Sequence, residues 1–200
     1  MLTAIGDVMR RVYERGWITT RDGNISMRKR EGKYLYITPS GWRKTIVHPE
    51  HVVRIEIVKE PLTGIMIPNV REGQQPSGEL WMHWNLQRDT RITRTVVHVH
   101  ATHIVAAIYA CFDLQAISAE FPEISRYTRV GQTVPALPAL SRELADAPAE
   151  CFSLGRTERW PSISWGRPTM AFVRSGWIHG PPMNISSVST TFVRLSSRAM

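Results

Sequence analysis

Two histidines separated by a single residue, His98 and His100, are the most informative pair in the sequence. Residues two apart in a strand point to the same face of the sheet, so both imidazoles could converge on one ion. Imidazole nitrogen suits zinc and other first-row divalent metals. An HxH pair taken alone more often has a structural or solvent-facing role, so the metal hypothesis depends on the neighbouring motifs.

Glu79 is the acidic residue that could work beside such a metal. It follows Pro76, Ser77 and Gly78 at the start of a predicted helix that runs to about Arg88. The helix dipole stabilises a carboxylate at this end, so a capping role would explain Glu79 without any function. The functional alternative is a general acid/base that moves a proton to or from the carbon beside a metal-bound carbonyl.

Three short turns offer hydrogen-bond donors for an anion. They are Gly-Asn-Ile-Ser at 23–26, Thr-Pro-Ser-Gly at 38–41 and Ser-Gly at 77–78. Each supplies hydroxyl, amide or backbone N–H groups in a tight loop, as anion sites do. Separately they are ordinary turns. Together, with Lys44 close to the second, they predict a pocket for a phosphate or a carboxylate.

The elements that must position these residues alternate along the chain without a strict βαβ rhythm. Apolar spacing predicts helices at 3–16, 76–88, 103–111 and 141–152, and strands at 24–28, 34–38, 52–58 and 96–100. The three early strands suggest a meander. We therefore expect an α/β domain with a central mixed or antiparallel sheet flanked by helices.

Composition narrows the class of protein. Two hundred residues with 42% apolar content suit one compact domain. The first residues contain no long apolar run, which predicts a cytoplasmic protein without a membrane span. Of the net charge of +8, residues 156–200 carry +5, with six Arg and one Glu, leaving +3 for the rest. We therefore expect no nucleic-acid partner, since the folded part would need a basic face.

The motifs, taken in order, closely resemble the class II aldolase/adducin superfamily over residues 3 to 154. The resemblance is carried by GNIS at 23–26, TPSG at 38–41 with Lys44, PSGE at 76–79, Met82-His83, and VVHVHATH at 96–103. It implies a three-layer fold, a homotetramer with active sites near subunit interfaces, and two zinc ligands, His98 and His100. Glu79 would be the catalytic acid/base. Five residues would hold the anionic end of the substrate: Asn24, Ser40, Gly41, Ser77 and Gly78.

The resemblance implies a metal-dependent lyase that cleaves a small sugar-like hydroxy-carbonyl compound by a retro-aldol reaction. Epimerisation or dehydration within the same superfamily is the first alternative, and a metal-free, adducin-like interaction domain is the second. Gly78 stands where many relatives have a second serine, which leaves open whether the substrate carries phosphate.

Residues 156–200 differ from the rest of the chain. The family supplies a third histidine ligand sixty or more residues after the pair, but only His179, followed by Pro181 and Pro182, occurs beyond His103. When the codons are shifted by one base near 154–157, degenerate codons leave choices, and the result can be read as a family-like sequence that ends in a helix. The single codons of Met and Trp force five of its residues, and the codon overlapping Met170 can encode the missing histidine.

We therefore predict an aldolase-like domain at 1–155 and an out-of-frame tail at 156–200 that is not native-like. The alternative is a divergent but genuine carboxy-terminal segment.

Overall fold

The computed structural model describes most of the chain up to residue 154 and two short segments beyond it. The described residues are 2–29, 32–88, 94–122, 128–131, 133–134, 136–154, 169–171 and 191–193. The predicted domain boundary at 155, and most of the tail for which a shifted frame was predicted, lie outside these residues. His179 lies outside them as well.

A six-stranded antiparallel sheet forms the centre of the fold, in the order β4-β3-β2-β1-β5-β8. Its strands are β1 (Asn24–Arg28), β2 (Tyr34–Ile37), β3 (Val53–Lys59), β4 (Met66–Asn69), β5 (Arg94–Val99) and β8 (Thr191–Val193). Strands β1, β2 and β3 form the predicted meander, and β4 extends it by one strand. Two further strands, β6 (Thr128–Val130) and β7 (Thr169–Ala171), pair in parallel as a separate small sheet.

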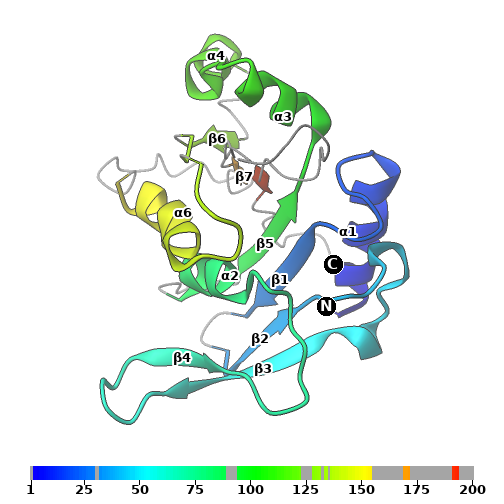
Figure 1. The fold of residues 1–200 in the computed structure, drawn as a ribbon, viewed down its shortest axis with the longest axis vertical. Helices are drawn as coiled ribbons and strands as arrows, with labels where there is room; N and C mark the ends of the chain where they lie inside the picture. Colours follow the sequence, from blue (N-terminus) through cyan, green and yellow to red (C-terminus); the bar gives the residue numbers. More distant parts are fainter. Residues whose placement is uncertain are drawn as a thin grey trace.

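Helices cover both faces of the main sheet, which makes the three layers expected of the fold class (Figure 1). Helix α1 (Leu2–Glu14) lies on one side, while α2 (Leu80–Gln87) and α6 (Arg142–Leu154) lie on the other. Helices α3 (Thr102–Tyr109) and α4 (Leu114–Glu120) follow β5. Short 3-10 turns, η1 (Lys44–Ile46) and η2 (Pro49–His51), connect β2 to β3.

Successive side chains of a strand point to opposite faces of the sheet, so the residues of the central strands divide between the two helical layers. Ile25 of β1 and Val97 and Val99 of β5 pack with the apolar stripe of α1, in a core that includes Ile5 and Met9. The alternate residues of the same strands therefore face α2. A second core on that side joins β2 and β3 to α2, and a third joins α2 to α6. The polar residues of β1 and β5 lie between these apolar cores.

The helix predicted from Pro76 in fact begins at Leu80. Pro76 pairs with Pro39 in an isolated antiparallel bridge, and the Ser77 N–H donates to the Thr38 carbonyl at 3.0 Å. The bridge holds Pro76 beside Pro39 as part of a strand-like pair, so the helix begins after it. The position of Glu79 changes accordingly, from the first turn of the helix to its N-cap.

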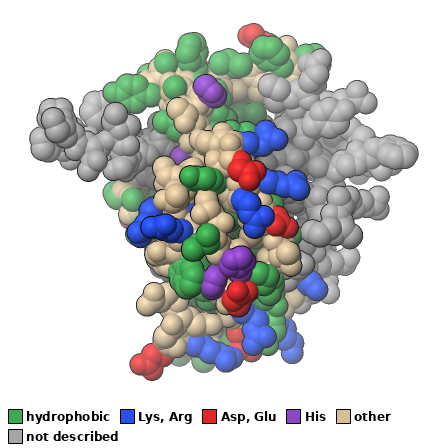
Figure 2. Space-filling view, turned by 90° about the vertical axis from the view of Figure 1, so that its right-hand side faces the viewer, with side chains coloured by type: hydrophobic (Ala, Val, Ile, Leu, Met, Phe, Trp, Pro, Cys, Tyr) green, Lys and Arg blue, Asp and Glu red, His purple; other side chains and the backbone are tan. Residues whose placement is uncertain are grey.

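Two features of the surface bear on partners. None of the described helices is by itself long and apolar enough to cross a membrane, although the bent pair α3 and α4 passes that test together. On the face shown in Figure 2, basic and acidic side chains are intermixed rather than gathered by sign.

Candidate functional site

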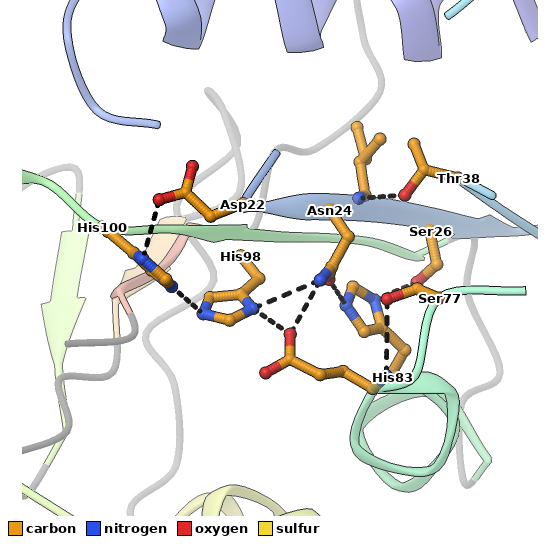
Figure 3. A network of polar contacts seen from close by, with 10 residues as sticks. Asp22, Asn24, Ser26, Thr38, Ser77, His83, His98 and His100 are labelled. Carbon is orange, nitrogen blue, oxygen red and sulfur yellow. Dashed lines mark hydrogen bonds and ion pairs between the residues drawn. The ribbon is translucent and has the colours of Figure 1, made fainter. Parts of the chain in front are cut away.

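Three polar side chains of the α2-facing layer come from two neighbouring strands. Asn24 and Ser26 lie on β1 and His98 on β5, and the register places Asn24 directly opposite His98. All three are buried. The sheet therefore brings together residues that are more than seventy positions apart in the sequence, and α2 covers them (Figure 3).

Glu79 makes no side-chain capping hydrogen bond, although it occupies the N-cap of α2. Its carboxylate points to the sheet instead. Oε2 contacts the Nδ1 atom of His98 and accepts a hydrogen bond from Asn24 Nδ2 at 2.7 Å. The capping role that the sequence left open for Glu79 therefore does not describe its side chain.

The two imidazoles of the HxH pair face each other through their Nε2 atoms, which are 3.0 Å apart. Each ring has a carboxylate at its other nitrogen: Glu79 at Nδ1 of His98, and Asp22 Oδ2 at 3.3 Å from Nδ1 of His100. A carboxylate only accepts hydrogen bonds, so the Nδ1–H tautomer of each ring is the one that satisfies its carboxylate. In that tautomer both Nε2 lone pairs point at one another.

Facing lone pairs repel unless a cation lies between them, so the donor chemistry of His98 and His100 fits a divalent metal ion. Two nitrogen ligands of a tetrahedral zinc ion, each at about 2.0–2.1 Å, are about 3.3 Å apart, close to the separation of these Nε2 atoms. Carboxylates behind ligating histidines are also a recurring arrangement. Within the described part of the chain, no group of three or more His, Cys, Asp or Glu side chains is placed to hold a metal ion.

A buried chain of hydrogen bonds fixes the direction of the Asn24 amide. His83 Nε2 contacts Asn24 Oδ1, and His83 Nδ1 lies 2.6 Å from Ser26 Oγ, which accepts from Gln87 Nε2. A neutral His83 satisfies the chain, because its Nε2–H donates to Oδ1 and the Ser26 hydroxyl donates to its Nδ1. The amide oxygen is thereby used, and the NH₂ group of Asn24 is left facing Glu79.

The pKa values of the two buried groups agree with this pattern. Burial raises the pKa of Glu79, but the electrostatic attraction and hydrogen bond of His98 and the Asn24 hydrogen bond outweigh it and bring the pKa to about 2. Burial lowers the pKa of His83 to about 3, although the charge of Glu79 opposes the shift. At neutral pH Glu79 is a carboxylate and His83 is uncharged.

The two remaining donor-rich turns lie side by side next to this site. The Ser40 N–H donates to the Gln75 carbonyl at 2.9 Å, and Thr38 Oγ1 accepts from the Ile25 N–H at 3.2 Å. Lys44 is buried, and its Nζ donates to the Pro39 carbonyl at 3.0 Å. Burial lowers the pKa of Lys44, while the charges of Asp22 and Glu79 raise it.

The five predicted anion-binding residues, Asn24, Ser40, Gly41, Ser77 and Gly78, therefore belong to three adjoining segments.

Gly78 lies close to the segment that leads into α6. A Cβ atom there would lie 3.2 Å from Cδ2 of Leu140, so this exposed side chain would have to shift by a few tenths of an ångström. Gly78 and Glu79 also line a cavity of about 560 Å³ between β4, α2 and α6.

Four residues of this network were not singled out by the sequence analysis. His83 and Ser26 had been quoted only within motifs, without a role of their own. Asp22 and Gln87 carried no signal, because an aspartate before a glycine and a glutamine at the end of a helix are common. Their significance comes from the register that places them together.

Comparison with known proteins assigns the family. The Class II Aldolase and Adducin N-terminal domain matches residues 3–158. The chain belongs to this family. L-fuculose phosphate aldolase of Methanococcus maripaludis is 28% identical over 150 residues, covering 75% of each chain.

Two solved structures share the fold. L-fuculose-1-phosphate aldolase from Thermus thermophilus has a TM-score of 0.53 at 24% identity and matches 74% of this chain and 68% of its own. YgbL from Klebsiella pneumoniae has a TM-score of 0.61 at 20% identity and matches 96% of this chain and 77% of its own. At these identities the two structures establish the fold and nothing about the substrate.

Proposed function

We propose that the chain is a metal-dependent aldehyde-lyase that cleaves a small hydroxy-carbonyl compound by a retro-aldol reaction. The observation that carries the proposal is the arrangement of Glu79, whose carboxylate faces His98 instead of capping its helix. Membership of the family supports a class II aldolase, and relatives named L-fuculose phosphate aldolase support a lyase.

Each residue has a distinct proposed task. His98 and His100 would hold a divalent ion, with zinc the first candidate, through their facing Nε2 atoms. When bound, such an ion polarises carbonyl and hydroxyl oxygens and offsets the negative charge that develops as the bond breaks. In the aldol direction the Glu79 carboxylate would remove a proton from the carbon beside the carbonyl. In cleavage it would take up a proton that the reacting hydroxyl loses, directly or through water, and pass it to that carbon.

Substrate positioning would fall to the three adjoining segments. Asn24, Ser40, Gly41, Ser77 and Gly78 would bind the anionic end of the substrate. Asn24 would use its amide and the glycines their backbone N–H groups, while the serines would use their hydroxyls, because their own N–H groups already donate to Gln75 and Thr38. Lys44 would stabilise the turn at 38–41 from its buried side, because its ammonium group donates to the Pro39 carbonyl. The cavity of about 560 Å³ beside Glu79 is of a size that binds small molecules.

Hydrogen exchange at carbon tests the proton-transfer step without requiring the natural substrate. The zinc-loaded chain would be incubated in D₂O with dihydroxyacetone phosphate or with dihydroxyacetone, and loss of the hydroxymethyl proton signal followed by NMR. We expect exchange, faster with the phosphorylated compound. Glu79→Gln should slow it by about 100-fold or more, as expected for loss of a general base.

Glu50→Gln is the matched control, because Glu50 is an exposed glutamate of η2. It should exchange as the wild type does. Exchange in Glu79→Gln at the wild-type rate would remove Glu79 from the proposed role. Product analysis with ketose phosphates then separates cleavage from epimerisation and dehydration, because only cleavage releases two carbonyl fragments.

The proposed assembly is a homotetramer. Exposed apolar residues on the turn between β3 and β4 and on β4 itself, Leu62, Ile65 and Met66, give support because large exposed apolar side chains often mark interfaces. Sedimentation velocity of the wild type and of a Leu62→Ser, Ile65→Ser variant would measure the state. A monomer at micromolar concentration for the wild type would contradict it.

A further inference from the structure

Asp22 shares its two carboxylate oxygens between two partners. Oδ1 accepts from the backbone N–H of Thr19, within a turn that Thr19 Oγ1 also stabilises by accepting from the N–H groups of Arg21 and Asp22. Oδ2 lies 3.3 Å from Nδ1 of His100. Asp22 therefore links a turn with bonds of its own to one of the two facing histidines.

His100 needs such a link more than His98 does. β5 ends at Val99, so His98 is held within the ladder opposite Asn24, whereas His100 lies just beyond the strand. The backbone N–H of His100 instead donates to the Trp17 carbonyl at 2.7 Å. The segment from Trp17 to Asp22 thus contacts both the backbone and the ring of His100, as Figure 3 shows for the ring.

The tautomer of His100 decides where its lone pair points. With an acceptor at Nδ1, the ring carries its proton there and Nε2 presents a lone pair toward His98. With a donor at Nδ1, the proton moves to Nε2 and the lone pair is lost from the side that faces His98. A neutral imidazole has only one N–H, so the partner at one nitrogen sets the chemistry of the other.

We propose that Asp22 is a positioning residue that holds His100 in the Nδ1–H tautomer and so keeps two Nε2 lone pairs converging on a divalent metal ion. The inference rests on the proposed metal site of His98 and His100. The inference adds Asp22, a residue outside the motifs that identify the family. It also means that the segment before β1 controls the orientation of His100.

Asp22→Asn separates this role from a structural one. The Asn side chain has one oxygen and one NH₂ group. When its oxygen accepts from the Thr19 N–H, as Oδ1 does now, its NH₂ group faces Nδ1 of His100 and donates to it. The variant keeps the turn and reverses the tautomer. Asp7→Asn is the control, because it removes the same charge from an exposed residue of α1 that pairs with Arg10.

Three measurements on the full chain test the proposal. Zinc affinity is obtained by competition with a chromophoric chelator, the His100 tautomer by ¹⁵N NMR of the metal-free chain, and the fold by metal-free thermal melting. We expect Asp22→Asn to bind zinc about 10- to 100-fold more weakly, the usual effect of losing an outer carboxylate. Its Nε2 signal should move to the protonated range, with the metal-free melting temperature unchanged.

Each other outcome has a definite meaning. Wild-type zinc affinity and an Nδ1–H tautomer in Asp22→Asn would overturn the inference and leave the metal site standing. An equal loss of affinity in Asp7→Asn would also overturn it, because net charge would then be the cause. No zinc binding by the wild type would overturn the metal proposal, and the inference with it.

Discussion

The hydrogen-bond network of the site has two halves that differ in their exposure to solvent. On one side, His83, Ser26 and Gln87 are completely buried. On the other, the Asp22 and His100 side chains are each 29% exposed. Asn24, Glu79 and His98 join the two. The buried half has a defined donor and acceptor at each step, whereas the open half ends in two acceptors that face each other.

The difference separates two physical tasks. Buried polar groups are costly unless bonded, so the inner half selects one arrangement and gives Asn24 and Glu79 fixed positions. The outer half can exchange a ligand because water reaches it. A site that must hold its geometry and still bind and release small molecules needs both properties, and here they belong to different residues.

The largest effect should come from breaking the inner half. His83→Ala leaves Asn24 Oδ1 and Ser26 Oγ without their partner and opens a cavity, which should lower the free energy of unfolding by about 4 kcal/mol. Urea titration measures it. His103→Ala, at an exposed position of α3, should change it by less than about 0.5 kcal/mol. Similar losses in both variants would remove the contrast between the halves.

A third metal ligand should raise the zinc affinity of the outer half. Restoring the predicted shifted frame near 154–157 can supply a histidine from the codon overlapping Met170, and the restored sequence would end in a closing helix. Zinc should then bind about 100-fold tighter or more, and the zinc-loaded chain should melt higher, since metal binding stabilises the fold. Zinc content and melting temperature of both versions are compared. A chain as written that binds one zinc tightly and melts no lower contradicts the shift.

Gly23 connects the two halves, between Asp22 and Asn24. Its φ of 71° is costly for residues with a side chain, and an added Cβ would lie 2.4 Å from Ile18 Cγ2 and 3.1 Å from the His98 carbonyl oxygen. Gly23→Ala should therefore cost about 2 kcal/mol of stability. Gly16→Ala is the control: its φ is 67°, but it has no atom within 4 Å of an added Cβ. Equal losses would mean that backbone strain alone acts at Gly23.

The smallest predicted effect is a pH dependence of the inner half. The folded pKa of His83, about 3, lies below its ordinary value of 6.5. As pH falls below 6.5 the unfolded chain binds a proton that the folded chain does not, so stability decreases. Between pH 7.5 and 5.5 the loss should be about 1.4 kcal/mol. His83→Gln should lack this component, and His103→Gln should keep it. Wild-type and His83→Gln curves of equal slope would show that His83 is protonated in the folded chain.

Much of the fold followed from local patterns. The apolar stripe of α1 and the short β-like runs of β1, β2 and β5 are local patterns, and these segments form the helix and strands that they predicted. Strand β4 was not predicted, because Pro68 argues against a strand except where its missing N–H is harmless. β4 lies at the edge of the sheet, where that condition is met. The start of α2 was predicted too early because the bridge that holds Pro76 against Pro39 joins segments that are far apart in the sequence.

For the site, local patterns in the sequence were enough to show which residue types are available and that His98 and His100 share one face of a strand. They could not show whether Glu79 caps its helix or reaches the sheet, since both fit the same local pattern. The packing of the elements settled that, by placing Asn24 opposite His98 and α2 against them. The same packing determines which hydrogen-bond partners His83 and Asp22 have. Sequence spacing fixes neighbours within an element, whereas the direction of a hydrogen bond between elements depends on how they pack.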